Sequence, residues 1–431
     1  MPEAVIVATA RSPIGRAFKG SLTQVRPDDL AATIVRAALD KVPGLDPGDI
    51  DDLMLGCAEP EGKQGVNMAR RVAVALGIDS LPGTTVNRFC ASSVQTSRMA
   101  FHAIRAGEGD VFISAGVECV SHYPAFSGAG AGREEFLNPA FDQARARTEV
   151  TAKTNEIWHD PRVDGQLPDV YMSMGQTAEN LATSRGITRA EQDEFGVRSQ
   201  NLAEKAIADG FFEREITPVT TPDGTVVARD DGPRPGVTME GVSGLKPVFR
   251  EQGTVTAGNC CPLNDGAAAV IIMSDSKAAE LGLTPLARIV STGVSALSPE
   301  IMGLGPVEAS RRALALAGMQ VGDMDLVEIN EAFAAQVIPS YRELGIDIDL
   351  VEINEAFAVQ VLASIDDLGI DPDKLNVHGG AIALGHPFGA TGARITTTLL
   401  NGLSTRDVQF GLETMCIGGG QGMAIIYERL S

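Results

Sequence analysis

Residues 376–394 read NVHGGAIALGHPFGATGAR, and residues 414–422 read TMCIGGGQG. The first stretch places His386 in a Gly/Pro-rich loop directly before a helical pattern over Gly389–Leu400. The second places Cys416 at the end of a predicted strand. Small residues let a backbone approach a ligand closely and adopt positive φ, and loops commonly carry function. We therefore interpret these two stretches as the chemical centre of the chain.

A third stretch, VNRFCASS, supplies a candidate nucleophile. Cys90 lies where a strand pattern gives way to a helical pattern over Ala91–Ile104. The reactive form of cysteine is the thiolate, which the dipole and free N–H groups at a helix N-terminus stabilise. The alternative is that Cys90 is only a small buried hydrophobe. Ser92 and Ser93 at the helix opening, together with a candidate histidine elsewhere, favour the nucleophile.

The histidine and the second cysteine suit complementary roles. His386 stands between Gly and Pro, so it cannot be a mid-helix core residue, and it fits a general base that activates Cys90. Its closest rival, His378, precedes two glycines but lacks the loop-to-helix position. Without its neighbouring glycines, Cys416 would be interpreted as a core residue at the end of a strand. Beside three glycines it becomes a candidate proton carrier, and the N–H of Gly418 becomes a candidate oxyanion donor.

Composition narrows the class of protein. The chain has 431 residues, enough for two or three domains, and its net charge of −21 argues against nucleic acid or an anionic membrane surface as partner. Six cysteines without a CxxC pair predict neither a disulfide framework nor a metal site, and reduced thiols are typical of the cytoplasm. We expect no signal peptide and no membrane span, since a basic N-terminal region and an apolar run of about 20 residues are both missing.

Strand and helix patterns alternate along the chain, which predicts a layered α/β protein. We interpret residues 1–120 with 247–275 as an N-terminal half, 121–246 as an inserted loop domain richer in Gly, Pro and charge, and 276–431 as a C-terminal half. Each half has one candidate catalytic residue in a loop that opens a helix. The two halves are therefore expected to face each other across a shared site.

Individual elements follow from apolar periodicity. The predicted strands cover Ala4–Ala8, Asp52–Gly56, Thr84–Val86, Val111–Gly116, Ala287–Val294, Val408–Cys416 and Met423–Tyr427. The predicted helices cover Leu30–Leu39, Met68–Leu76, Ala91–Ile104, Gln176–Ile207, Val307–Ala317 and Gly389–Leu400, and Ser127–Arg133 is expected to be a loop.

A 24-residue tandem duplication lies within residues 325–371. Asp325–Asp347 reads DLVEINEAFAAQVIPSYRELGID and Asp349–Asp371 reads DLVEINEAFAVQVLASIDDLGID, with the first ten residues identical. Two copies are too few for a solenoid. If the fold has one slot for a strand–NEAF–helix unit, the other copy must loop out or dock elsewhere. Loop-closure entropy tolerates such an insertion, since each doubling of a loop costs only about 0.6 kcal/mol.

Five motifs in one order resemble the thiolase family over essentially the whole chain: VNRFCASS, GTVTAGN with NDGAAAV, NEAFA, GGAIALGHPFGATGAR and CIGGGQG. The resemblance implies the thiolase fold, in which two βαβαβαββ halves form a five-layered α-β-α-β-α core with an inserted loop domain. It implies a homodimer or homotetramer and leaves open a partner in a β-oxidation complex. It also implies no permanently bound cofactor, with acyl-CoA and coenzyme A as the ligands.

The resemblance further assigns roles to residues of the three stretches. Cys90 would be the acylated nucleophile, His386 its base, and Cys416 the acid/base for the α-proton of acetyl-CoA or for the leaving thiolate. One oxyanion site would use the N–H groups of Cys90 and Gly418. The other would use His386 with a water molecule held by the Asn of NEAF.

The duplication leaves two candidates for that asparagine. Asn354 lies 32 residues before His386, which is the family's spacing, and we favour it for this reason. Asn330 is the alternative, because it is correctly placed after the predicted Val307–Ala317 helix. Both flanks are family-like, so the sequence does not decide between the two copies.

Four further residues concern coenzyme A. Arg234 matches a CoA-contacting arginine of the family. Ser173, which precedes Met174 in YMSMGQTAEN, stands where many acetoacetyl-CoA thiolases have His, and Cys261 in GNCC replaces a serine that faces the pantetheine. These departures favour an acetyl-CoA C-acyltransferase of β-oxidation that cleaves 3-ketoacyl-CoA with CoA into acyl-CoA and acetyl-CoA. The alternatives are an acetoacetyl-CoA thiolase working in the Claisen direction and an inactive thiolase-fold scaffold.

Overall fold

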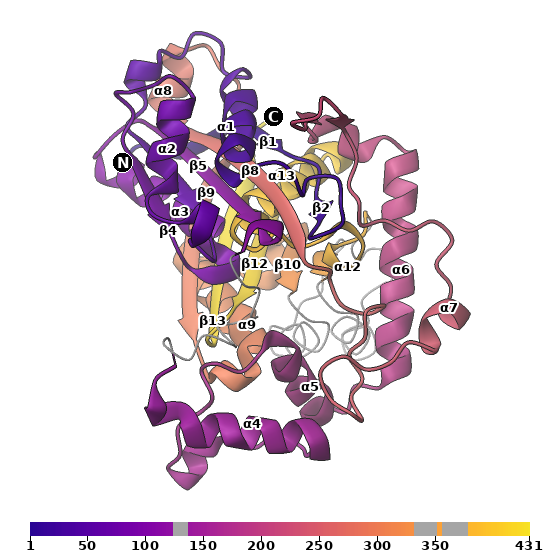
Figure 1. Cartoon of the computed structure of the whole chain (residues 1–431). Helices are drawn as coiled ribbons and strands as arrows, with labels where there is room; N and C mark the ends of the chain where they lie inside the picture. Colours follow the sequence, from indigo (N-terminus) through magenta and orange to yellow (C-terminus); the bar gives the residue numbers. More distant parts are fainter. Residues whose placement is uncertain (124–136, 332–350, 356–377) are drawn as a thin grey trace.

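The chain forms two sets of five strands that join into one sheet (Figure 1). The computed structural model describes residues 1–123, 137–331, 351–355 and 378–431. The N-terminal set comprises β1 (Ala4–Arg11), β3 (Asp52–Gly56), β4 (Gly83–Val86), β5 (Val111–Cys119) and β8 (Asn264–Ser274), with β2 (Gly15–Arg16) beside β8. The C-terminal set comprises β9 (Ala287–Ala296), β10 (Leu326–Glu331), β11 (Val351–Glu355), β12 (Phe410–Ile417) and β13 (Gln421–Arg429).

The two sets repeat one topology. Across the sheet, the strands of the two sets follow the orders β1-β8-β5-β3-β4 and β9-β13-β12-β10-β11. If the strands of each set are numbered as they occur in the sequence, both orders read first, fifth, fourth, second, third. In each order, the first strand pairs with the second and the second with the third in antiparallel fashion. The third, fourth and fifth strands pair in parallel. A short antiparallel contact joins the sets where Val5 and Ile6 pair with Arg288 and Ala287. The expectation of two similar halves is confirmed.

Helices cover both sets and fill the space between them. Alternate residues of a strand face opposite sides of a sheet. Val5 packs in a cluster with α1 (Pro27–Leu39) and α2 (Met68–Ala75), whereas Ile6 packs with α3 (Ser92–Ala106) and α13 (Phe388–Arg406). On β13, Ile425 joins the cluster of α3 and α13, and Ile426 faces α9 (Gly305–Ala317). The resulting order of helices, sheet, central helices, sheet and helices is the five-layered arrangement.

The described part of residues 121–246 lies around this core. It contains α4 (Asp142–Thr154), α5 (Met174–Arg185), α6 (Arg189–Ala208), α7 (Met239–Ser243) and the hairpin of β6 (Val219–Thr220) and β7 (Val226–Val227), and Figure 1 shows α4, α6 and α7 along the lower and right-hand edges. Two short helices complete the chain, α8 (Asp275–Glu280) and α12 (Ala381–Leu384). Among the described residues, no helix has the length and apolarity needed to cross a bilayer.

One predicted helical stretch is divided into two helices. Gln176–Ile207 is not continuous, because α5 ends at Gly186 with a left-handed φ of 68° and α6 starts afresh. Thr188 and Glu191 form a capping box at the start of α6, which satisfies N–H groups that a continuous helix would bond internally. The predicted loop Ser127–Arg133 lies outside the described residues. The other predicted elements of the described residues are present, with ends that differ by a few residues.

Both copies of the duplication contribute a strand. β10 comes from the first copy and β11 from the second, and they pair in parallel with Asn330 opposite Asn354. β10 also pairs with β12, so the first copy is the inner strand and the second copy forms the edge of the sheet. The second copy is therefore the one that docks elsewhere, and it does so by adding a strand to the edge of the sheet. The remainder of each copy lies outside the described residues.

Candidate active site

Cys90 lies in a strained turn between β4 and α3. The single 3₁₀ turn Phe89–Ala91 contains it, and Phe89 has a φ of +44°, which is costly for a residue with a side chain. Hydrogen bonds hold the turn, since the Ser92 hydroxyl accepts from the Arg88 N–H at 2.9 Å and donates to the Phe89 carbonyl at 2.6 Å. The strain is thereby fixed at the position of the candidate nucleophile.

The Cys90 thiol meets the glycine loop that follows β12. A Cβ placed on Gly418 would lie 3.6 Å from the ring of Phe89, the neighbour of Cys90. Burial raises the pKa of the Cys90 thiol to about 12, although the nearby Gly418 N–H opposes the shift. A thiol with such a pKa is protonated at neutral pH, so the site needs a base to form the thiolate. The structure thus brings together Cys90 and Gly418, two of the residues predicted from sequence.

Cys416 belongs to the same group. It is buried near the end of β12, two residues before Gly418. Burial raises the pKa of the Cys261 thiol, and the thiolates of Cys260, Cys90 and Cys416 would raise it further. The sulfur of Cys261 therefore lies near the other three sulfurs. Gly419 and Gly420 then turn the chain with φ of 76° and 78°, in the left-handed region that favours glycine.

His386 is held in one tautomer. The Thr391 hydroxyl donates to the Pro387 carbonyl at 2.9 Å, so its oxygen accepts from Nδ1–H of His386 at 2.7 Å. The free lone pair is therefore on Nε2, which is buried and has no hydrogen-bond partner among the described residues. Burial lowers the pKa of His386 to about 3, and the nearby Arg394 charge contributes to the shift. The imidazole is consequently neutral at pH 7, as a general base must be.

Two buried polar residues attach the His386 loop to the N-terminal half. The Asn264 side chain accepts from the His386 N–H at 2.9 Å. The Glu118 carboxylate accepts from the Gly389 N–H at 2.8 Å, at the start of α13, and from the Ala58 N–H at 2.7 Å. Contacts between α13 and the turn of Cys90 complete the assembly of the loops.

Sequence reasoning missed Glu118 and Thr391 as parts of the site. Glu118 follows an apolar strand pattern with no motif of its own, and its partner Gly389 lies 271 residues away. Thr391 did stand within the quoted stretch GHPFGATGAR, five residues after His386. A hydroxyl about one helical turn after a loop histidine is a signal that could have found it.

The remaining predicted residues lie around this centre. Met174 begins α5 with Ser173 as its N-cap, and a Cβ placed on Gly418 would lie 3.7 Å from the Met174 sulfur. Arg234 is exposed, and its N–H donates to the Gln200 side chain at 2.8 Å. The rival His378 stacks on Phe211 at 3.6 Å between ring centroids.

The structure does not place the two asparagine side chains. Only the backbones of Asn330 and Asn354 are described, on β10 and β11 respectively. Asn330 pairs with Met415, the neighbour of Cys416, whereas Asn354 lies one strand further out. The choice between them stays a prediction.

Replacement of His386 should change the pH dependence of stability. Its pKa is about 3 in the folded protein and about 6.5 when unfolded, so between these values the unfolded chain binds the extra proton and the folded protein loses stability as pH falls. Between pH 7 and pH 5 this amounts to about 2 kcal/mol. We expect His386→Gln to lose less free energy of unfolding over that interval, measured by urea titration. Equal losses in both proteins would contradict a buried neutral imidazole.

Comparisons with known proteins identify the family. The sequence model of the thiolase N-terminal domain matches residues 4–276, and that of the thiolase C-terminal domain matches twice, over 283–348 and 346–429. A 3-ketoacyl-CoA thiolase of Bacillus subtilis (strain 168) is 43% identical over 441 residues, covering 99% of this chain and 100% of the relative. A second 3-ketoacyl-CoA thiolase, from Idiomarina loihiensis, is 40% identical with 100% of both chains covered.

A solved structure agrees in fold. The crystal structure of the Bacillus anthracis acetyl-CoA acetyltransferase superposes with a TM-score of 0.80 at 37% identity, covering 100% of this chain and 99% of the other. The family models and the full-length relatives lead to one conclusion. The chain belongs to the thiolase family.

Proposed function

We propose that the protein cleaves 3-ketoacyl-CoA with CoA into acyl-CoA and acetyl-CoA through an acyl-Cys90 intermediate. The observation that carries the proposal is the packing of the Gly418 loop and β12 against the turn that holds Cys90, which brings the Gly418 N–H near the Cys90 thiol. It sets an oxyanion donor and the nucleophile side by side, and the strand that ends beside Gly418 bears a second cysteine. The full-length relatives named 3-ketoacyl-CoA thiolase support the same reaction.

Each residue has a defined part in the reaction. His386 Nε2 takes the proton of the Cys90 thiol, and the sulfur attacks the C3 carbonyl of the substrate. The C2–C3 bond breaks, the acyl group stays on Cys90, and the acetyl-CoA carbanion takes a proton from Cys416. The Cys416 thiolate then takes the proton of incoming CoA, whose sulfur attacks the acyl group. Acyl-CoA leaves, and Cys90 regains its proton from His386.

Negative charge develops on the thioester oxygen in both half-reactions, so two oxyanion sites are needed. The N–H groups of Cys90 and Gly418 supply one. His386 and a water molecule held by an asparagine supply the other. The position of β10 beside β12 supports Asn330 for this role, against the preference for Asn354 drawn from spacing alone.

Coenzyme A would lie over the described part of residues 121–246. Burial lowers the pKa of Arg16, and the positive charge of Arg234 lowers it further. The guanidinium groups of Arg16 and Arg234 therefore lie near each other. Such a pair fits a phosphate of CoA. Ser173, Met174 and Cys261 would contact the pantetheine end, since Met174 and Cys261 lie near the loop and sulfurs of the site.

We further propose the organisation expected from the sequence. Residues 1–120 with 247–275 and residues 276–431 form the two catalytic halves, and 121–246 form the loop domain. The expected assembly is a homodimer or homotetramer in the cytoplasm, with no permanently bound cofactor. A molar-mass measurement by light scattering tests the assembly, and a monomeric mass would contradict it.

A chain-length series tests the reaction. Decay of the magnesium–enolate absorbance is measured with 3-ketoacyl-CoA substrates of increasing acyl length in the presence of CoA. We expect turnover of substrates longer than four carbons. Activity confined to acetoacetyl-CoA would instead support the second candidate, an acetoacetyl-CoA thiolase, which the similarity to the Bacillus anthracis acetyl-CoA acetyltransferase favours. No decay with any substrate would support the inactive scaffold.

A further inference from the structure

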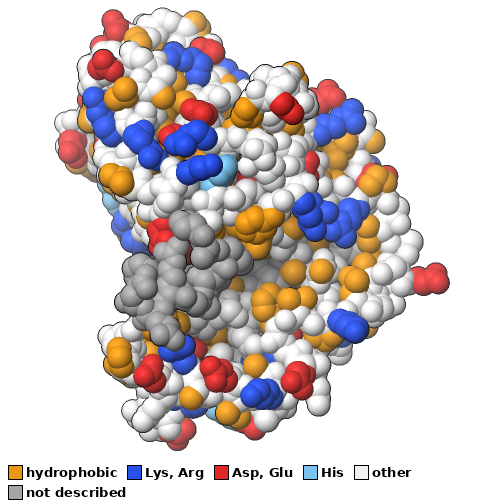
Figure 2. All heavy atoms as spheres, viewed as in Figure 1, with side chains coloured by type: hydrophobic (Ala, Val, Ile, Leu, Met, Phe, Trp, Pro, Cys, Tyr) orange, Lys and Arg blue, Asp and Glu red, His pale blue; other side chains and the backbone are white. Residues whose placement is uncertain are grey.

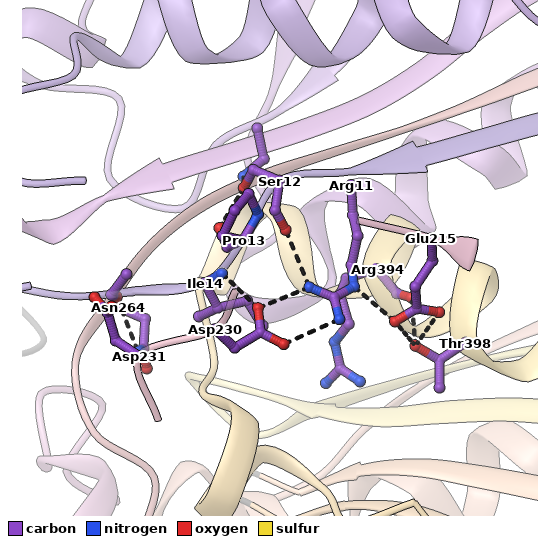
Figure 3. Close-up of polar contacts among 12 residues, drawn as sticks. Arg11, Ser12, Pro13, Ile14, Glu215, Asp230, Asp231, Asn264, Arg394 and Thr398 are labelled. Atoms are coloured by element: carbon purple, nitrogen blue, oxygen red, sulfur yellow. Dashed lines mark hydrogen bonds and ion pairs between the residues drawn. The ribbon is translucent and has the colours of Figure 1, made fainter. Parts of the chain in front are cut away.

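A buried ion pair connects the inner copy of the duplicated strand to the helix that follows His386. Arg394 on α13 and Glu328 on β10 lie 3.6 Å apart, and their side chains are only 3% and 2% exposed. Arg394 also lies beside a second buried group of three charges, in which Arg11 is bound by both Glu215 and Asp230 (Figure 3). The ion pair is therefore part of a charged layer enclosed by the N-terminal strand, the C-terminal half and residues 215–230.

The strand register sets Glu328 between two other glutamates. It lies opposite Glu413 of β12 on one side and opposite Glu352 of β11 on the other. Glu413 receives hydrogen bonds from Thr396 at 2.7 Å and Tyr427 at 2.9 Å, and burial raises its pKa to about 7. Of the two described carboxyl groups, Glu328 makes the ion pair with Arg394, and Glu413 has neutral hydroxyl partners.

The geometry of α13 relates this pair to the chemistry. α13 begins two residues after His386, contains Thr391 and Arg394, and connects by a short turn to β12, so it runs antiparallel to β12. β10 is parallel to β12 and contacts α13. β10 is therefore antiparallel to α13. Residue 330 lies closer than Glu328 to the N-terminal end of α13, which follows His386.

We propose that Glu328 and Arg394 are positioning residues, whose ion pair fixes the inner copy of the duplicated strand against the helix that orients His386. The pair also fixes register, because a slip of β10 by one residue would bring an apolar residue opposite Arg394. A buried charge tolerates such a change poorly. This inference rests on the proposed thiolase reaction. Since the copies are identical around Glu328 and Glu352, only their placement in the sheet distinguishes the two carboxylates.

Three matched substitutions test the proposal in the full chain: Glu328→Gln, Glu352→Gln and Glu413→Gln. We expect Glu328→Gln to lower kcat for thiolysis by about 10- to 100-fold with KM for CoA little changed, because misplaced groups slow chemistry more than binding. The other two variants should stay within about twofold of the parent. Equal effects of Glu328→Gln and Glu352→Gln, or a loss confined to Glu352→Gln, would overturn the proposal.

A second substitution separates positioning from stability. Arg394→Gln removes a positive charge near His386, so the pKa of His386 should rise and the acid limb of the kcat/KM profile should move to higher pH. An acid limb that stays in place would show that Arg394 does not act on His386. If Glu328→Gln does not fold, Glu328→Asp keeps the charge and shortens the side chain, and its loss in kcat should exceed that of Glu352→Asp.

The activity of the parent protein distinguishes failure of the proposed thiolase reaction from failure of the positioning role of Glu328 and Arg394. Absence of thiolysis in the parent would refute the proposed function. Thermal unfolding of the variants would still test the ion pair, because Glu328→Gln should lower the melting temperature and Glu352→Gln should not. An active parent with equal melting temperatures and equal kcat for these two variants would refute the positioning role alone.

Discussion

Cys90→Ser is expected to abolish formation of the acyl-enzyme and to lower kcat by about 10⁴-fold or more, as removal of a catalytic nucleophile does in other enzymes. The reason lies in the turn between β4 and α3. Its strained Phe89 and the Gly418 N–H hold a sulfur atom at one point, and a serine hydroxyl there is a far weaker nucleophile for a thioester. Mass spectrometry after incubation with 3-ketoacyl-CoA should find the acyl adduct on the Cys90 peptide of the parent and no adduct in the variant.

Cys260→Ser is the matched control for this experiment. Cys260 is a free, partly buried cysteine near the site, but it has no contact with the glycine loop among its described interactions. Its replacement should leave the adduct and kcat within about twofold of the parent. An adduct found on the Cys416 peptide would reverse the roles of the two site cysteines, and an adduct that persists in Cys90→Ser would refute the acyl-Cys90 intermediate.

Local chemistry explains why the sequence singles out the candidate site residues. Cys90 and His386 each stand just before a helix, and Cys416 stands near the end of a strand that a run of glycines follows, so these features are visible over a few neighbouring residues. The alternation of strands and helices likewise predicted the layered core, because each element buries one face. Such signals need no knowledge of distant contacts.

The residues that orient the site are less visible because they act across the fold. Glu118 receives the Gly389 N–H from the opposite half, and Arg394 meets a carboxylate on a strand of the duplicated segment. Neither contact has a sequence spacing that would predict it. The break at Gly186 was missed for a different reason, since apolar periodicity continues on both sides of it and only the left-handed φ ends the helix.

The duplication shows most clearly where sequence reasoning stops. Ten identical residues in each copy have the same strand propensity, so only spacing could separate the copies. The distance to His386 favours Asn354, whereas the position after the Val307–Ala317 helix favours Asn330. The sheet imposes another criterion. The strand beside β12 receives hydrogen bonds on both edges, whereas an outer strand has one edge unpaired, and β10 holds the inner position.

Asn330→Ala is therefore expected to lower kcat by about 10²- to 10³-fold, the usual cost of losing one oxyanion-site contact. Asn354→Ala, in an identical stretch of sequence, should stay within about twofold of the parent. Both variants are compared by steady-state thiolysis, with melting temperatures as the control for folding. A loss confined to Asn354→Ala would show that the second copy supplies the asparagine.

Deletion of residues 325–348 makes the comparison decisive. The shortened chain keeps one copy, which follows Met324 directly and has the same first ten residues, so it should occupy the position of β10 beside β12 and retain activity. Asn354→Ala, silent in the full chain, should then lower kcat by about 10²- to 10³-fold. If both single variants are silent in the full chain but this one is inactivating after the deletion, the two copies exchange in one slot. The residue's place in the sheet, and not its surrounding sequence, would then decide whether it takes part in the chemistry.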